Sequence, residues 1–180
     1  MTPAAALAAA TLLAAPPVPP EVGAVTARTA DGYSFRGAVI LPGSPDCLLD
    51  VVYRLEHVRV FSGDYEVTLV REGEGWNEMS FRARGLLYDV TLVYRRTLDR
   101  AGRRVAITLV GGKQGGMLPR VLASDASYSI VPAPGGVRLG YEQRVTLSQG
   151  LLRDLYVRQA TAEARAFMER LRDHALRTCP

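Results

Sequence analysis

A single amide within an otherwise apolar strand is the first candidate for chemistry in this sequence. Residues 137–147, VRLGYEQRVTL, alternate with a period of two, which is typical of a strand with one buried face. The expected inward face comprises Val137, Leu139, Tyr141, Gln143, Val145 and Leu147. An unpaired buried amide costs roughly 1 to 3 kcal/mol. Two hypotheses follow: a filled core satisfies Gln143 through Tyr88, Tyr94 or the backbone, or Gln143 faces a ligand.

Tyrosines supply most of the other polar groups on expected inward faces. Tyr88, Val90, Leu92 and Tyr94 share one face of a second strand, opposite Asp89, Thr91, Val93 and Arg95. Because tyrosine titrates near pH 10, such groups are better suited to positioning a ligand than to removing protons from it.

Catalytic and metal-binding patterns are absent from the sequence. Neither His57 nor His174 has Cys, Asp or Glu at metal-ligand spacing, and a polar helix end explains His174 through the helix dipole. There is no G-x-S-x-G motif. The stretch LVGGKQGGM lacks the order of a phosphate-binding loop, so we interpret residues 111–123 as a glycine-rich connection, either a flap at a cavity mouth or a floppy loop. The sequence therefore predicts no catalytic residue, metal site or cofactor.

Charge and cysteine content bound the function further. The net charge of +4 comes from 22 Lys and Arg residues against 18 Asp and Glu residues, and the basic residues form no stripe of the kind that binds nucleic acid. We therefore expect no nucleic-acid partner. Cys47 and Cys179 fit no metal motif; a disulfide between them would close a long loop, but the sequence slightly favours two unpaired thiols.

The first 24 residues are predicted to be a signal peptide or an unstructured N-terminal extension, followed by one domain over residues 25–180. An apolar stretch over residues 4–15 has the length of a signal-peptide core and is too short to span a bilayer. Small-residue cleavage patterns occur at Val22-Gly23-Ala24 and at Val25-Thr26-Ala27, although no Lys or Arg precedes the apolar stretch. We expect a periplasmic or secreted protein, with a cytoplasmic location as the alternative.

The elements that position these residues follow from periodicity and caps. A strand is expected over residues 26–41 with an interruption at Asp31-Gly32, then a helix capped by Ser44 with Pro45 at its first position, and a short helix over 57–61. Further strands are expected over 65–72, 76–84, 87–99, 104–110, 127–131 and 137–147. A long amphipathic helix over 151–177 closes the chain; its apolar face comprises Leu152, Tyr156, Ala160, Ala164, Phe167, Leu171 and Ala175.

This order of elements resembles the START-like, helix-grip superfamily, which includes polyketide cyclases, coenzyme Q-binding proteins and lipid-transfer domains. The segments most similar to it are SPDCLLDVVYRLEHVRVF and ASYSIVPAPGGVRLGYEQRVTL. The resemblance implies an α+β fold, in which a curved antiparallel sheet wraps around a long C-terminal helix and two short helices follow the first strand. It also implies a cavity between sheet and helix, lined by Tyr88, Tyr94, Tyr128, Leu139, Tyr141, Gln143, Tyr156 and Phe167.

The function implied by the resemblance is binding or transport of a hydrophobic small molecule, lipid-like or polycyclic. The alternative is an enzyme similar to polyketide cyclases or dehydratases, and a third hypothesis is a scaffold protein with a filled core. Membrane contact is expected only transiently, during ligand exchange.

Overall fold

The order of strands and helices along the chain is largely the order that the hydrophobic periodicity predicts. The computed structural model describes residues 20–86 and 88–179. Its strands are β1 (Gly23–Arg28), β2 (Gly32–Leu41), β3 (Glu66–Gly73), β4 (Trp76–Gly85), β5 (Tyr88–Asp99), β6 (Arg104–Gly116), β7 (Val121–Ala133) and β8 (Gly136–Leu147). Its helices are α1 (Pro45–Tyr53), α2 (Leu55–Phe61) and α3 (Arg153–Thr178).

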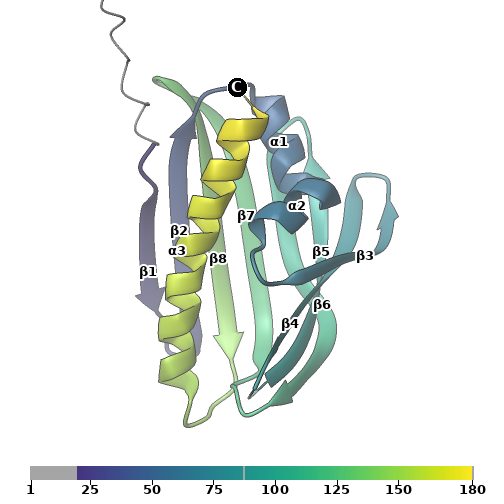
Figure 1. The fold of residues 1–180 in the computed structure, drawn as a ribbon, viewed down its shortest axis with the longest axis vertical. Coiled ribbons are helices and arrows are strands. Elements are labelled where there is room, and N and C mark those ends of the chain that lie inside the picture. Colours follow the sequence, from purple (N-terminus) through teal and green to yellow (C-terminus); the bar gives the residue numbers. More distant parts are fainter. Residues whose placement is uncertain (1–19, 87, 180) are drawn as a thin grey trace, which may run out of the picture.

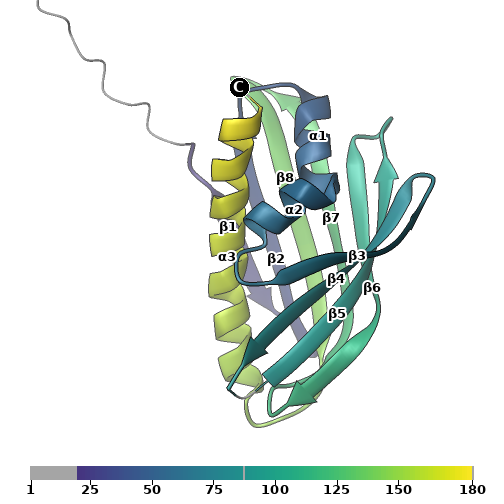
Figure 2. The same cartoon turned by 45° about the vertical axis from the view of Figure 1, so that its right-hand side comes forward.

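The strands form one antiparallel sheet in the order β1-β2-β8-β7-β6-β5-β4-β3. After the β1–β2 hairpin, α1 and α2 carry the chain to the far edge, and a meander from β3 to β8 returns it to β2 (Figure 1). The register places Phe35 of β2 opposite Gln143 of β8. β2 and β8, which are distant in sequence, therefore pair next to the β1 edge of the sheet. The sheet curves around α3 (Figures 1 and 2). This arrangement confirms the predicted α+β helix-grip fold.

The helix boundaries have local causes. Ser44 caps α1 by accepting a hydrogen bond from the Cys47 N–H at 3.2 Å, and Pro45 occupies the first turn, where a missing N–H costs nothing. Helix α3 packs against β1 and β2, and its buried residues include Met168, Leu171 and Ala175. Within residues 20–86 and 88–179, no helix has both the length and the apolar character needed to cross a bilayer.

Two predicted segments differ from the observed ones. The opening segment is two strands, because the chain turns back at residues 29–31, where the Thr29 N–H donates to the Gly32 carbonyl at 3.1 Å. The glycine-rich segment is mostly strand rather than a flap, since β6 continues to Gly116 and pairs with β5. At Gly112, φ is +142° and a Cβ would lie 2.1 Å from the Thr91 oxygen, so the close approach of β5 requires glycine there.

The two cysteines form a disulfide, which corrects the preference for free thiols. Cys47 lies in α1 and Cys179 follows α3, with their Cα atoms 5.9 Å apart. The sequence could not show this proximity, because it arises from docking of α1 beside the end of α3 across a separation of 132 residues. The bond joins the helical entry of the fold to its last helix.

The buried apolar residues form two separate clusters. The larger one joins α1, α2 and the C-terminal half of α3 to the sheet and contains Phe35, Leu48 and Leu139. The smaller cluster contains Tyr33, Val145 and Val157, near the start of α3. A continuous core would have formed one cluster, so the interior is divided along the length of α3.

Candidate functional site

A cavity of about 350 Å³ lies where the two apolar clusters are separated. The inner face of the sheet, α2 and α3 enclose it, and its size falls at the lower end of the range for small-molecule sites. Strand β5 contributes every second residue to the lining: Tyr88, Val90, Leu92, Tyr94 and Arg96. Exposed lining residues, including Tyr65, Gln159 and Glu163, place the mouth between α3 and the β3 edge of the sheet.

Phenol groups dominate the polar part of this lining. Seven of the eight tyrosines border the cavity: Tyr33, Tyr65, Tyr88, Tyr94, Tyr128, Tyr141 and Tyr156. Burial raises the pKa of Tyr94 to about 12, while the neighbouring Ser124 acts in the opposite direction. Burial likewise raises the pKa of Tyr128 and of Tyr141. These phenols stay neutral near pH 7, so they can donate and accept hydrogen bonds but are poor general bases.

Aromatic contacts fix the inner wall of the cavity. The Tyr141 ring centroid lies 4.9 Å from that of Tyr128 and 5.4 Å from that of Phe167. Phe167 also contacts Phe61 of α2, with 5.5 Å between centroids. Such pairs are favourable beyond their apolar area, so sheet, α2 and α3 are held together around a preformed wall.

Gln143 is partly satisfied by protein and also borders the cavity. Its Nε2 donates to the Ser124 Oγ at 3.3 Å, and Gln143 is half-buried in the lining. Its Oε1 accepts no hydrogen bond from the described residues. The partner is thus Ser124 rather than Tyr88, Tyr94 or the backbone, and the surrounding space is not a filled core. Ser124 lies on β7 outside the predicted strand, so no sequence pattern selected it.

Arg96 is a cavity residue that the sequence interpretation missed. Its guanidinium is 2% exposed and donates to the carbonyl oxygens of Val52 and Tyr53, the latter at 2.8 Å, at the C-terminal end of α1. It also contacts the Met79 sulfur at 3.2 Å. Burial lowers the pKa of Arg96. The alternation that assigned Tyr88 and Tyr94 inward also predicts Arg96 inward if continued by one step.

The predicted site residues are mostly brought together. Seven of them border the cavity: Tyr88, Tyr94, Tyr128, Tyr141, Gln143, Tyr156 and Phe167. Leu139 does not, because it is fully buried in the larger cluster between Val39 of β2 and Ile130 of β7. Alternation identified its inward direction correctly, but it does not show where along β8 the cavity ends.

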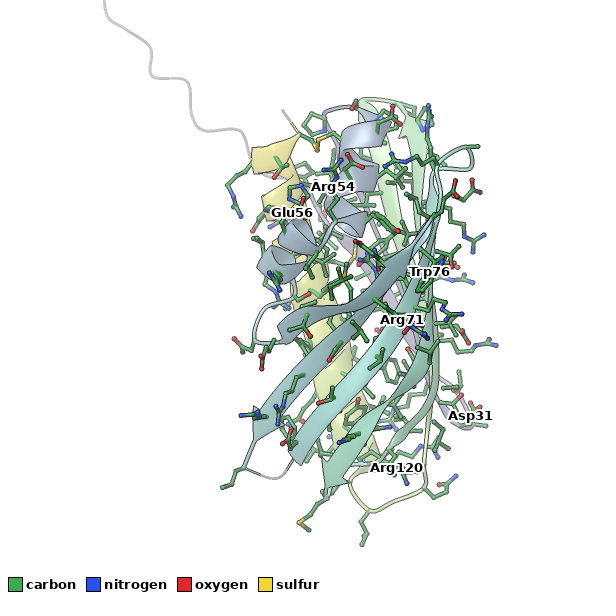
Figure 3. All side chains as sticks on the ribbon, turned by 90° about the vertical axis from the view of Figure 1, so that its right-hand side faces the viewer. Asp31, Arg54, Glu56, Arg71, Trp76 and Arg120 are labelled. Carbon is green, nitrogen blue, oxygen red and sulfur yellow. A yellow bond between two sulfur atoms is a disulfide. The ribbon has the colours of Figure 1, made fainter. Side chains whose placement is uncertain are left out.

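The outer face of the sheet has a different chemistry. Glu78 of β4 accepts hydrogen bonds from Arg71 at 2.7 Å and from Arg95 at 2.8 Å. Both guanidinium groups also lie over the Trp76 ring, and Figure 3 labels Arg71 and Trp76. The Arg71 hydrogen bonds hold the pKa of Glu78 below its usual range. Glu78 is therefore fully engaged by two arginines of the outer face, and this group lies apart from the cavity lining.

Solved structures with the same arrangement of sheet and helices are numerous. A STAR-related lipid transfer protein from Xanthomonas axonopodis matches with a TM-score of 0.69 at 16% identity, over 87% of this chain and 93% of that chain. A START superfamily protein from Mycobacterium smegmatis matches with a TM-score of 0.61 at 12% identity, over 79% of this chain and 96% of that chain. This chain has the START-like helix-grip fold.

The same START-like fold also occurs in an enzyme. The Zhui aromatase/cyclase from a Streptomyces species matches with a TM-score of 0.53 at 17% identity, over 88% of this chain and 91% of that chain. No protein-family model matches the sequence, and no curated protein does. The likeness is therefore one of fold, and the chemistry of the START-like cavity has to be argued from its side chains.

The two histidines of the START-like chain meet away from the cavity lining. His57 Nδ1 and His174 Nε2 are 3.1 Å apart, between α2 and α3, and His174 is 9% exposed. His174 is thus a buried residue in contact with α2, although the sequence placed it on a polar helix end. In residues 20–86 and 88–179, no group of three or more His, Cys, Asp or Glu side chains could hold a metal ion.

Proposed function

We propose that the protein binds and transports a hydrophobic small molecule in the cavity between the sheet and α3. The observation that supports this most strongly is the division of the apolar interior into two clusters with a cavity of about 350 Å³ beside both. Leaving apolar side chains without partners is costly, so such a space is expected where a ligand fills it. The fold is shared with a protein described as a lipid transfer protein.

The lining indicates an apolar ligand with a small number of polar groups. Leu92, Ile107 and Leu118 supply apolar surface, and the tyrosines and Gln143 supply hydrogen-bonding groups. Pockets of this composition bind by apolar contact and orient the ligand by a few polar bonds. A lipid-like or polycyclic molecule fits this description.

The enzymatic alternative has one argument in its favour, the shared fold with an aromatase/cyclase. A cyclase needs groups that transfer protons at neutral pH, and burial moves the pKa of Tyr94 and Tyr141 away from that range. We therefore favour a carrier. Turnover of a polyketone that is lost in Tyr141→Phe would support the enzyme instead.

We propose further that the protein works outside the cytoplasm, as a periplasmic or secreted protein. The Cys47–Cys179 disulfide is consistent with that location. Val22 is buried in the core and Pro20 O accepts a hydrogen bond from Arg172. Cleavage after Ala24 or Ala27 would remove these contacts, so we expect a mature N terminus ahead of Val22, to be measured as the intact mass of the purified protein.

Ligand exchange at a membrane surface would use the end of the molecule opposite α1. Three connections meet there, β4–β5, β6–β7 and β8–α3 (Figures 1 and 2), and each has an exposed apolar residue, respectively Leu86, Met117 and Leu151. The Ser148 N–H donates to the Arg120 carbonyl at 2.8 Å, which ties two of these connections together; Arg120 lies at this end in Figure 3. Replacing the three apolar residues with serine should slow ligand transfer to vesicles without changing affinity. Unchanged transfer would contradict this role.

The carrier function itself is tested by looking for a ligand. Native mass spectrometry of the protein as purified should show a co-purified apolar molecule, and a fluorescent apolar probe should bind to the protein after its removal. Ala160→Trp, which fills the cavity from α3, should abolish probe binding, whereas Ala162→Trp on the exposed side of the same helix should not. Equal binding by both variants, or none by the native protein, would refute the proposal.

A further inference from the structure

Arg96 has a charge that nothing around it balances. The side chain is 2% exposed, and no acidic side chain of residues 20–86 or 88–179 forms an ion pair with it. Its partners are the carbonyl oxygens of Val52 and Tyr53 and the sulfur of Met79. The negative end of the α1 dipole offsets part of the charge. A fully desolvated cation with only neutral partners is nevertheless unfavourable compared with one paired to an anion.

The position where a compensating acid would be expected holds an amide. Asn77 of β4 lies directly opposite Arg96 of β5 in the register, and both are buried. The Asn77 Oδ1 is the one enclosed side-chain polar atom, among those the structure describes, that has no hydrogen-bond partner. The protein therefore places no negative charge opposite the buried Arg96 guanidinium.

Arg96 also has an unused donor next to the cavity. A guanidinium has five N–H groups, and the bonds to Val52, Tyr53 and Met79 engage Nη1 and Nη2 only. The Nε–H donates to no acceptor of the described residues. Because Arg96 borders the cavity, this free donor is the one that a ligand in the cavity would engage.

Two phenols border the same cavity as Arg96. Tyr128 is 3% exposed and Tyr141 is 8% exposed, and both border the cavity. Neither hydroxyl has a hydrogen-bond partner among the described residues, and neither is enclosed. The charge of Arg96 opposes the effect of burial on the pKa of each phenol, as expected for near neighbours. One cationic and two neutral donors thus border the same closed end of the cavity.

We propose that this closed end is a carboxylate-binding subsite, in which Arg96, Tyr128 and Tyr141 bind the head group of an amphipathic monocarboxylic acid. The inference rests on the proposed carrier function and names its ligand class. The apolar tail then runs along Val90 and Leu92 towards the mouth.

The charge balance of the cavity specifies a monoanion. The other charged lining residues, Arg170 and Glu163, form an ion pair with each other at the mouth. Arg96 is therefore the one uncompensated charge of the lining, and a single carboxylate neutralises it. A dianionic head group such as a phosphate monoester would leave a negative charge desolvated.

The first test compares ligands on the native, delipidated protein with its disulfide intact. Calorimetric titration is done with dodecanoate, dodecanol and dodecyl phosphate, which share a tail and differ in head group. Because hydrogen bonds to charged groups are stronger than neutral ones, dodecanoate should bind at least about tenfold more tightly than dodecanol. It should also bind more tightly than dodecyl phosphate.

Equal affinity for dodecanol, or tighter binding of the phosphate, would overturn the subsite while leaving the carrier function intact. Absence of binding by all three and by the apolar probe would refute both.

The second test locates the subsite. Arg96→Gln should lose about tenfold or more of the affinity for dodecanoate and keep that for dodecanol within about threefold. Arg95→Gln, the adjacent residue on the outer face, removes the same charge and should bind both ligands as the native protein does. The double variant Tyr128→Phe/Tyr141→Phe removes only hydroxyls and keeps the aromatic wall. It should weaken dodecanoate binding by several-fold even if Arg96→Gln does not fold. Native affinity for dodecanoate in that variant and in any folded Arg96→Gln protein would reject the assignment.

Discussion

At the scale of single residues, Gln143 combines a contact with protein and a place in the cavity lining. Its amide nitrogen is held by Ser124, while its oxygen is left for whatever occupies the cavity. The alternatives suggested by the sequence, a structural amide or a ligand-binding one, are therefore not exclusive. Removing the Gln143 amide should cost the protein little stability, because the group borders an open cavity rather than a filled core.

Gln143→Leu should accordingly change the free energy of unfolding by less than about 1 kcal/mol. Gln114→Leu is the matched control, because the Gln114 side chain is bound at both ends by the backbone of Val121, at 2.7 and 2.9 Å. We expect the control to cost about 1 to 3 kcal/mol, since two backbone groups lose their partner. Chemical denaturation of the three proteins measures this. A comparable loss in both variants would show that Gln143 is structural.

Alternation along strands predicted which side chains face inward, and it predicted little beyond that. It assigned Tyr88, Tyr94 and Tyr141 to inward faces, and in the structure these residues border the cavity, as does Arg96 when the same alternation is continued. It could not show that Leu139 lies in the packed cluster while Gln143, four residues further along the same face of β8, borders the cavity. Whether an inward residue meets another side chain or empty space depends on which helix covers it, and that is a long-range property.

At the scale of elements, the contact between α2 and α3 contains a pH-sensitive pair. His57 and His174 share one hydrogen bond, so at least one ring must be neutral to accept it. Burial lowers the pKa of His174 from its ordinary value, and the charges of His57 and Arg177 lower it further. Protonation of His174 is thus less favourable in the folded protein than in the unfolded chain.

Stability should therefore fall as the pH drops below about 6.5, the ordinary histidine value. Below that pH the unfolded chain binds a proton at His174 more readily than the folded protein does. Above it His174 is neutral in both states, so it contributes no pH dependence. Thermal melts between pH 5 and pH 8 measure the slope. His174→Leu should flatten the profile over the lower part of this range, whereas a slope that is unchanged in this variant would assign the effect to other groups.

The elements themselves were predicted best where a short-range rule specifies them. Ser44 and Pro45 define the start of α1, and the repeat along α3 defines its packed face. The rules failed at β6, where glycines that usually mark a loop instead allow β5 and β6 to approach closely. The same residue type permits both outcomes, and only the neighbouring strand decides between them.

At the scale of the whole molecule, one covalent bond joins the two ends of the helical layer. The Cys47–Cys179 disulfide connects α1 to the residue that follows the C-terminal end of α3. Because α1 supplies the carbonyl groups that hold Arg96, the bond also supports the inner end of the site.

Replacing both cysteines with serine should lower the free energy of unfolding by about 2 to 4 kcal/mol, since the unfolded chain regains the entropy of a long loop. Denaturation of the double variant, beside native protein with and without reductant, measures this. Reduced native protein should match the variant. An unchanged midpoint in both would contradict a structural role for the bond.

The pairing of β2 with β8, and the bond from α1 to the segment after α3, also constrain the order of biogenesis. Cys179, the partner of Cys47, and β8, the neighbour of β2, are both synthesised late in the chain. A chain that lacks Cys179 would keep an unpaired thiol at Cys47. Closure of this bond therefore has to wait until the last helix has been made, which places it among the final steps of folding.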